Sequence, residues 1–482
     1  MLPYCLFAEK RLVYKAGRFP DRRVGRMTSS ANGAAPPSVR EKQDLLKKIL
    51  KKRAGETTAP QEATPSGPQA DPPDETWKIE KFPAYQAILA HRAVARHMRV
   101  ESPFFSVHDG IAGATTLIEG RSYINFATYN YLGLNGDARV IAAAKQALDT
   151  YGVSASASRV VSGERPPHRA LEQALAGLHG VEDAIAFVSG HATNVSTIGC
   201  LFGPKDLILH DRLIHNSALQ GALLSGAARI AFNHNDMEGL DAKLAQARHS
   251  YEKVLIVAEG LYSMDGDLCP LDRLVEIKHR YRALLMVDEA HSLGVLGRSG
   301  RGIGEHFGID GAEVDLWMGT LSKTLSGCGG YIAGCKALVE LLKFTAPGFV
   351  YSVGLPPAIA AAAIASLECM TAEPWRVEHL RANGQLFLEL AQKRGLDTGL
   401  SAGYNVIPVI VGRSVWAARL SNALLTRGIN VAPIIYPAVE ERKARLRFFL
   451  SSEHTEAQIR TTVDAVAEEL ARIQAESEAE GI

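Results

Sequence analysis

A lysine set among hydroxyl and glycine residues is the most informative feature of this sequence. Lys323 lies in the run Gly319–Gly327 (GTLSKTLSG), and an apolar stretch that ends in Asp288 and Glu289 lies upstream of it. Such a lysine can form a Schiff base with an aldehyde cofactor, and a carboxylate at the end of a buried strand can keep a cofactor's ring nitrogen protonated. Together, Lys323 and Asp288 predict pyridoxal phosphate chemistry.

Each of these residues also has a purely structural interpretation. Residues 283–287 are typical of a short buried parallel strand, so Asp288 would emerge at its carboxyl end, where open α/β sheets bind ligands. Asp288 could instead cap the next helix, and His291 could be a core histidine satisfied by backbone groups. The combination of lysine, aspartate and histidine favours the cofactor site over these separate interpretations.

Further motifs accumulate in order along the chain, and with them the sequence resembles the α-oxoamine synthase family. They are Asn130–Leu134 (NYLGL), Ser189–Asn194 (SGHATN), Asp211–His215 (DRLIH), Glu259–Asp267 (EGLYSMDGD), Tyr351–Pro357 (YSVGLPP) and Ala444–Arg447 (ARLR). The resemblance runs from about Phe82 to the C-terminus. It implies an enzyme that uses pyridoxal 5'-phosphate to join an amino acid to an acyl thioester with loss of carbon dioxide.

The resemblance also implies roles for individual residues. Lys323 would be the lysine that binds the cofactor covalently, Asp288 the partner of the pyridine nitrogen, and His215 the imidazole stacked over the cofactor ring. These three form the implied catalytic set. Further cofactor-binding positions that the resemblance implies are Gly190, His191, Ser263, His291, Thr320 and Ser352.

The resemblance implies specific binding tasks for two of these positions and for one arginine. The backbone amides of Gly190 and His191 would receive the phosphate at a helix start, where unpaired N–H groups and the helix dipole converge. Arg447 would hold the substrate carboxylate, because a guanidinium can make two parallel hydrogen bonds to it. Asn130 is the second implied substrate-binding position, and Arg445 is expected to be a surface or structural neighbour. No metal ligand is expected.

Two departures from the family pattern concern substrate and affinity. Val353 and Gly354 stand where several relatives carry a further hydroxyl, so the phosphate contact expected from a neighbouring subunit would be reduced to Ser352 and backbone. The run Ser162–His168 (SGERPPH) differs from the biotin-pathway enzyme and resembles members attached to polyketide-type assembly lines.

Composition excludes several other classes of protein. The chain has 482 residues, 46% of them hydrophobic, which is enough for a large core. Lys and Arg total 53 against 52 Asp and Glu, so the nearly neutral chain has no overall positive field that would attract nucleic acid. Six cysteines show no zinc spacing or Cys-x-x-Cys pair, which favours a reducing, cytoplasmic location. No secretory signal is expected in residues 1–26.

An uncharged segment, residues 346–367, could suggest a membrane span. Pro347, Pro356 and Pro357 interrupt it, whereas a span needs about 20 residues of continuous helix. We therefore expect no membrane span but a buried interface, and the resemblance implies a homodimer with shared active sites.

The first 80 residues differ in composition from the rest. Residues 38–53 have capping-box spacing and one apolar face surrounded by lysines, which predicts a basic amphipathic helix, and residues 54–75 are typical of a flexible linker. Two interpretations of the helix have equal weight. It docks an acidic partner such as an acyl carrier protein, or it is only a solvated helix.

The remaining chain is expected to have the α/β fold of pyridoxal-phosphate-dependent transferases, of the type I aminotransferase kind. Apolar runs alternate with helical stretches, which predicts a mostly parallel sheet with helices on both faces. The expected parts are an N-terminal lobe (81–134) with a helix and a hairpin within 106–126, a large domain (135–354) and a smaller α+β C-terminal domain (355–482) with strands at 406–411 and 446–450.

Three other functions remain open at this point. An aminotransferase shares the fold and the lysine but needs no thioester. A catalytically silent subunit could support an active paralogue, although Lys323, Asp288 and His215 are all present. The third possible function is that of a tethered assembly-line module, determined chiefly by the N-terminal 80 residues. This function would change the partner of the protein but not its chemistry.

Overall fold

The computed structural model describes residues 71–97 and 100–480. The chain divides into two units, Met1–Lys81 and Phe82–Ile482. In the first unit the described residues form two short 3₁₀ turns, Asp74–Thr76 and Ile79–Lys81. The predicted helix 38–53 and most of the predicted linker 54–75 lie outside the described residues.

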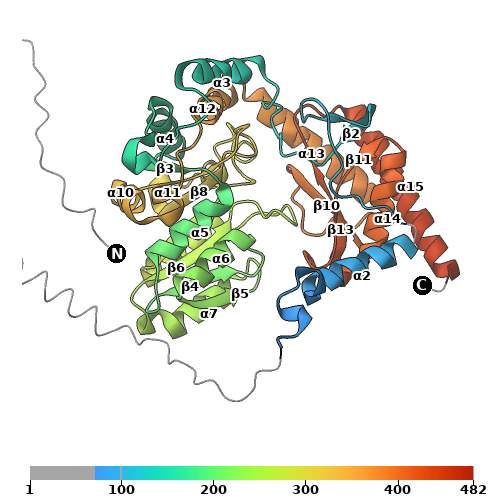
Figure 1. Ribbon diagram of the computed structural model, residues 1–482, viewed down its shortest axis with the longest axis horizontal. Helices are drawn as coiled ribbons and strands as arrows, with labels where there is room; N and C mark the ends of the chain where they lie inside the picture. Colours follow the sequence, from blue (N-terminus) through green and yellow to red (C-terminus); the bar gives the residue numbers. More distant parts are fainter. Residues whose placement is uncertain (1–70, 98–99, 481–482) are drawn as a thin grey trace, which may run out of the picture. The chain divides into compact units, whose positions relative to one another are not determined.

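A seven-stranded sheet organises the second unit (Figure 1). Its strand order is β3-β9-β8-β7-β6-β4-β5. Only β9 runs against its neighbours β3 and β8, so the prediction of a mostly parallel sheet is confirmed. The strands are β3 (Asp183–Phe187), β4 (Leu207–Asp211), β5 (Ala228–Phe232), β6 (Val254–Glu259), β7 (Leu284–Asp288), β8 (Leu316–Thr320) and β9 (Gly330–Gly334).

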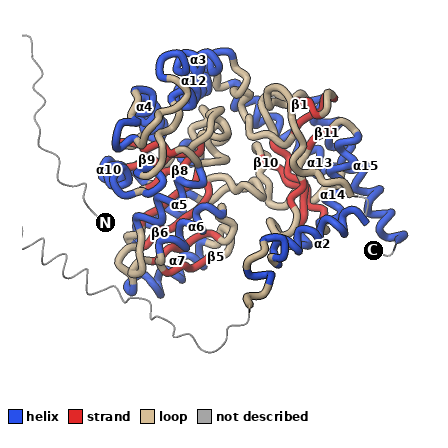
Figure 2. The backbone as a smooth tube through the Cα atoms, viewed as in Figure 1, coloured by secondary structure: helices blue, strands red, loops and turns tan. Residues whose placement is uncertain are grey.

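Helices cover both faces of this sheet (Figure 2). On β7, Leu285 and Val287 join one hydrophobic cluster and Met286 joins the other, because successive side chains of a strand point to opposite faces. Burial on both faces explains why the central strands are continuous apolar runs. The helices between residues 138 and 350 are α3 (Ala138–Tyr151), α4 (Pro166–His179), α5 (Gly190–Leu201), α6 (Asn216–Ser225), α7 (Met237–Ala247), α8 (Leu271–Tyr281), α9 (Ile303–Phe307), α10 (Lys336–Thr345) and α11 (Pro347–Val350).

The uncharged segment 346–367 forms the short helix α11 and most of α12 (Pro357–Ala372). Residues 351–356 separate the two helices. Pro356 and Pro357 stand at the start of α12, where the missing backbone N–H of proline removes no helical hydrogen bond. Among the described residues, no helix is both long and apolar enough to cross a membrane.

Two smaller sheets contain the remaining strands. The predicted hairpin is present as β1 (Thr115–Ile118) and β2 (Arg121–Asn125), and the predicted C-terminal strands are β10 (Val406–Gly412) and β13 (Ala444–Phe449). The sequence did not reveal that β2 pairs in parallel with β11 (Ile429–Asn430), which joins the N-terminal hairpin to the C-terminal region. The other elements are α2 (Pro83–His97), α13 (Trp375–Lys393), α14 (Ser414–Thr426), β12 (Pro433–Ile434) and α15 (Glu456–Glu480).

Candidate active site

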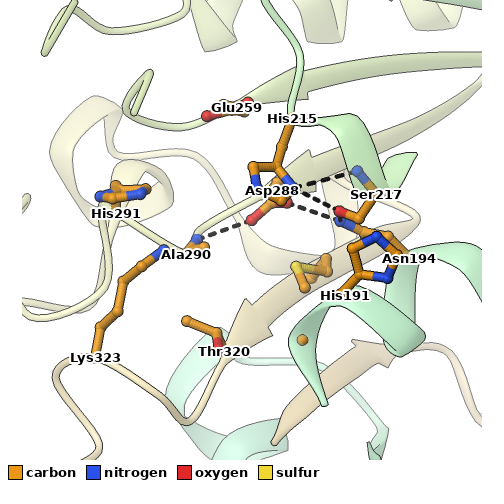
Figure 3. Close-up of a pocket in the computed structure, with 12 residues that line it drawn as sticks. His191, Asn194, His215, Ser217, Glu259, Asp288, Ala290, His291, Thr320 and Lys323 are labelled. Atoms are coloured by element: carbon orange, nitrogen blue, oxygen red, sulfur yellow. Dashed lines mark hydrogen bonds between the residues drawn. The ribbon is translucent and has the colours of Figure 1, made fainter. Parts of the chain in front are cut away.

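A cavity with about 410 Å³ of empty space lies at the carboxyl ends of the central strands (Figure 3). Residues from separate motifs reach it because β6, β7 and β8 end there and α5 and α6 begin there. Its lining contains seven of the predicted site residues, namely Gly190, His191, His215, Asp288, His291, Thr320 and Lys323, together with Asn194, Ser217, Glu259, Ala290 and Met318.

The amine of Lys323 faces this cavity without a salt-bridge partner among the described residues. Its Nζ lies 5.5 Å from the centre of the Tyr129 ring. Removal from water lowers the pKa of Lys323 to about 8, although the nearby carboxyl groups of Asp288 and Glu259 act to raise this pKa. A lysine with a pKa near neutrality has a substantial fraction of neutral amine, which can attack an aldehyde or accept a proton.

Asp288 is the last residue of β7, and its carboxylate is held from two sides. Oδ1 accepts a hydrogen bond from the backbone N–H of Ala290 at 2.9 Å, and Oδ2 accepts one from Nδ2 of Asn194 at 3.0 Å. The residue is 5% exposed, and no Lys, Arg or His of the described chain forms an ion pair with it. Because a buried carboxylate without a cationic partner is costly, a positively charged ligand atom is expected beside Asp288.

A second carboxyl group, that of Glu259, lines the cavity at the end of β6. Burial, and after it the charge of Asp288, raises the pKa of Glu259 to about 8. Neutral pH therefore favours the protonated form of Glu259.

His215 caps helix α6 and is supported by a chain of hydrogen bonds. Its Nδ1 lies 2.7 Å from Oγ of Ser217, and that hydroxyl accepts a hydrogen bond from Nδ2 of Asn194 at 2.9 Å. Asn194 also donates to Asp288, so one amide joins the supports of the histidine and of the carboxylate (Figure 3). The sequence interpretation missed Ser217 and did not single out Asn194, although Asn194 lies one helical turn after Gly190 within a quoted motif.

The start of helix α5 provides a site for an anion. The side chain of Ser189 caps the helix by accepting from the N–H of Ala192, and the backbone N–H groups of Gly190 and His191 have no acceptor in the described chain. A methyl group added at Gly190 would lie 2.9 Å from Oγ1 of Thr320, so glycine is what lets this hydroxyl approach the helix start. Free N–H groups at a helix N-terminus suit a phosphate.

Two predicted residues, Ser263 and Arg447, lie beside the cavity rather than in its lining. Nη1 of Arg447 donates to the carbonyl of Ser263 at 2.9 Å, and the N–H of Ser263 donates to Glu259 at 3.2 Å. Nε of Arg447 is buried and has no acceptor. That unused donor is suited to a ligand carboxylate.

Three other residues named from the sequence lie in different surroundings. The side chain of Asn130 bonds the carbonyl of Ala112 and the N–H of Asn135, so within this chain it braces a loop. Ser352 lies between α11 and α12 and does not line the cavity, and its predicted contact with a neighbouring subunit stays a prediction. Arg445 is buried and paired with Asp265 at 2.7 Å, so of its two expected placements the structural one is correct.

The residues of this cavity fit pyridoxal 5'-phosphate. They provide a lysine without a salt-bridge partner, a buried carboxylate without a cation, and free N–H groups at a helix start. A protonated ring nitrogen would supply the missing cation, and a phosphate would accept from the helix.

Several known proteins resemble this chain over most of its length. The family model described as aminotransferase class I and II matches residues 121–466. An 8-amino-7-oxononanoate synthase from Geobacter sulfurreducens is 41% identical over 360 residues, which are 74% of this chain and 91% of that protein. The structure of a serine palmitoyltransferase from Sphingomonas wittichii has a TM-score of 0.77 and 32% identity, covering 83% of this chain and 98% of that chain. An 8-amino-7-oxononanoate synthase structure from Francisella tularensis has a TM-score of 0.63 and 28% identity, covering 73% of this chain and 99% of that chain.

Proposed function

Because this chain belongs to the α-oxoamine synthase family of pyridoxal-phosphate-dependent enzymes, we propose that the cavity around Lys323 joins an amino acid to an acyl thioester with loss of carbon dioxide. The product is an α-amino ketone. The observation that carries the assignment is the meeting of Lys323, Asp288 and His215 in one cavity with the free helix start of α5.

Each cavity residue has a role toward the cofactor in this proposal. When bound, pyridoxal phosphate supplies an electron-withdrawing ring that stabilises negative charge at the α-carbon of the amino acid. Asp288 would hold the proton on the ring nitrogen, and His215 would stack over the ring. Gly190, His191 and Thr320 would receive the phosphate.

Arg447 and Lys323 act on the substrate. The guanidinium of Arg447 receives the amino acid's carboxylate, which fixes the α-carbon relative to Nζ of Lys323. The neutral amine of Lys323 takes the α-proton, a step for which its lowered pKa suits it. After the thiol leaves and carbon dioxide is lost, the same amine returns a proton to the α-carbon.

The test is a mass balance with a carboxyl-labelled amino acid and an acyl thioester. We expect equal amounts of labelled carbon dioxide, free thiol and amino ketone. Transfer of the amino group to a keto acid without release of thiol would make the protein an aminotransferase. Cofactor binding without turnover of any amino acid and thioester pair would make it a silent subunit.

We also propose a homodimer in which Ser352 of one subunit contacts the cofactor phosphate of the other. The exposed, uncharged side chains of Tyr351 (88% exposed) and Val353 (47% exposed) on either side of Ser352 support an interface at this loop. Full activity of a monomer at high dilution, by light scattering and assay together, would contradict the dimer.

The donor and the location of the protein are further parts of the proposal. An acyl carrier protein that binds the basic segment 38–53 is the proposed donor, and removal of residues 1–70 should then reduce use of carrier-bound acyl groups but not of small thioesters.

The five described cysteines are all free, which supports a reducing, cytoplasmic location.

A further inference from the structure

Tyr131 and His291 form a buried hydrogen-bonded pair at the edge of the cavity. The hydroxyl of Tyr131 lies 2.8 Å from Nδ1 of His291, although the two residues are 160 positions apart in the chain. Tyr131 has no exposed surface, and His291 is 6% exposed. His291 lines the cavity, and the described residues provide no hydrogen-bond partner for its other ring nitrogen, Nε2.

The plane of the His291 ring is held by its neighbours. Phe449 packs nearly parallel to it, with ring centres 6.1 Å apart and an angle of 17°, and Tyr129 meets it edge-on at 6.2 Å. Nδ2 of Asn405 donates to the backbone carbonyl of His291 at 3.1 Å. The ring therefore has a fixed orientation in which Nδ1 meets Tyr131.

Both members of the pair are uncharged at neutral pH. Burial raises the pKa of Tyr131 well above its usual value, and burial together with the charges of Lys323 and Arg447 lowers the pKa of His291 well below its usual value. A neutral imidazole carries one ring proton, which is either on Nδ1 or on Nε2.

The environment of the pair decides between these two tautomers. If Nδ1 carried the proton and donated it to the tyrosine oxygen, the phenolic proton would need a second buried acceptor. The neighbouring amide of Asn405 acts toward this oxygen as a donor that lowers the pKa of Tyr131, and its Oδ1 forms no hydrogen bond. If the hydroxyl donates to Nδ1, one hydrogen bond satisfies both groups, and this arrangement is favoured because an unmade hydrogen bond of a buried group lowers stability. The second arrangement leaves the ring proton on Nε2.

We propose that Tyr131 is a positioning residue that holds His291 as the Nε2–H tautomer, so that the nitrogen free of protein partners is a hydrogen-bond donor. This inference rests on the proposed function and on the role that the family resemblance implies for His291, contact with the phenolic oxygen of pyridoxal phosphate. When the phenol of the cofactor is ionised, its oxygen is a hydrogen-bond acceptor. The nitrogen that faces this oxygen must then be a donor. A donor at Nε2 would favour the anionic form of the phenolic oxygen, and Tyr131 would influence that oxygen only through His291.

The direct test is the protonation of the His291 ring in the full-length protein without and with pyridoxal phosphate. Nitrogen NMR of ring-labelled histidine, with the His291→Asn variant to assign the signal, should show a pyrrole-type Nε2 and a pyridine-type Nδ1. A proton on Nδ1 in the cofactor-free protein overturns the proposal. This readout needs no turnover, so failure of the proposed reaction would leave it unchanged.

The Tyr131→Phe variant tests the cause of the preference. We expect a mixture of the two tautomers, a shift of the bound cofactor's absorption maximum, and about two- to tenfold weaker binding of pyridoxal phosphate, the range that corresponds to one hydrogen bond. Unchanged Nε2 protonation in this variant would show that Tyr131 does not select the tautomer and would overturn the proposal.

Tyr331→Phe is the matched control. Its hydroxyl bonds Nε2 of His179 at 2.9 Å in an equally buried tyrosine–histidine pair outside the cavity. Loss of this hydroxyl should lower stability about as much as Tyr131→Phe does but leave the His291 signals and the cofactor spectrum unchanged. A shift of the His291 signals in both variants would trace the effect to general loss of packing and refute a specific role of Tyr131.

Discussion

Nδ2 of Asn194 lies 3.0 Å from Oδ2 of Asp288, so the first turns of helix α5 support the carboxylate at the end of strand β7. The same nitrogen donates to the hydroxyl of Ser217, which supports His215. One buried amide thus supports both the carboxylate proposed to partner the cofactor's ring nitrogen and the imidazole proposed to stack over the ring.

Replacement of Asn194 by Ala should damage the site through Asp288 and His215 together. The lost hydrogen bonds to buried groups should lower the free energy of unfolding by about 1–3 kcal/mol and reduce kcat by roughly ten- to a hundredfold. Denaturant unfolding and steady-state kinetics measure the two effects.

Thr197→Val is the control for Asn194→Ala. Thr197 is buried on the same helix, and its hydroxyl has no hydrogen-bond partner, so its replacement should change stability and kcat little. Similar losses in both variants would mean that the helix, rather than the amide of Asn194, supports the site.

Lys323→Ala should abolish turnover and leave a folded protein, because the amine has no structural bond to lose. Borohydride reduction of the wild-type protein should add the cofactor's mass to the peptide that contains Lys323, as read by mass spectrometry. Lys336, whose side chain is exposed at the start of α10, should remain unlabelled. Labelling elsewhere than Lys323 would refute its assignment.

Asp288→Asn should separate cofactor binding from chemistry. The amide keeps the shape of the carboxylate but not the charge that holds the ring nitrogen protonated, so bound cofactor should persist while exchange of the substrate's α-proton falls by at least a hundredfold. Deuterium exchange followed by NMR measures this rate. Exchange near the wild-type rate would mean that Asp288 has only a structural role.

His234 should make stability depend on pH above neutrality. Burial alone would lower its pKa, but hydrogen bonds to Asp211 and Asp267 outweigh burial and raise the pKa to about 10. A raised pKa means that the native state binds the proton more tightly than the unfolded state, so this stabilisation is complete below about pH 6.5 and is lost as pH rises toward 10.

The comparison of wild type with His234→Gln isolates this effect from other groups that titrate. Between pH 7 and 9.5 the wild type should lose up to about 1.4 kcal/mol more unfolding free energy per pH unit than the variant. Denaturant unfolding at several pH values gives both slopes. Parallel pH profiles would exclude His234 as the source.

Local sequence patterns were sufficient to predict part of the fold and part of the candidate site. The apolar runs at the central strands, the glycine at the start of α5 and the position of Asp288 after a strand are properties of short segments, because alternating burial and helix capping depend on neighbouring residues. For that reason the sequence pattern predicted the parallel sheet and a site with Lys323, Asp288 and His291, whereas His215 was added to that site by the family resemblance.

Other features depend on contacts between residues far apart in the chain. The pairing of β2 with β11, the bond from Asn194 to Asp288 and the bond from Tyr131 to His291 join segments separated by 94 to about 305 residues. Nothing in the local composition of either partner indicates such a bond, because side-chain hydrogen bonds form where the folded backbone brings a donor and an acceptor within about 3 Å. The sequence alone therefore determined the chemistry available to this protein, and only the tertiary structure decided which protons and charges the site presents.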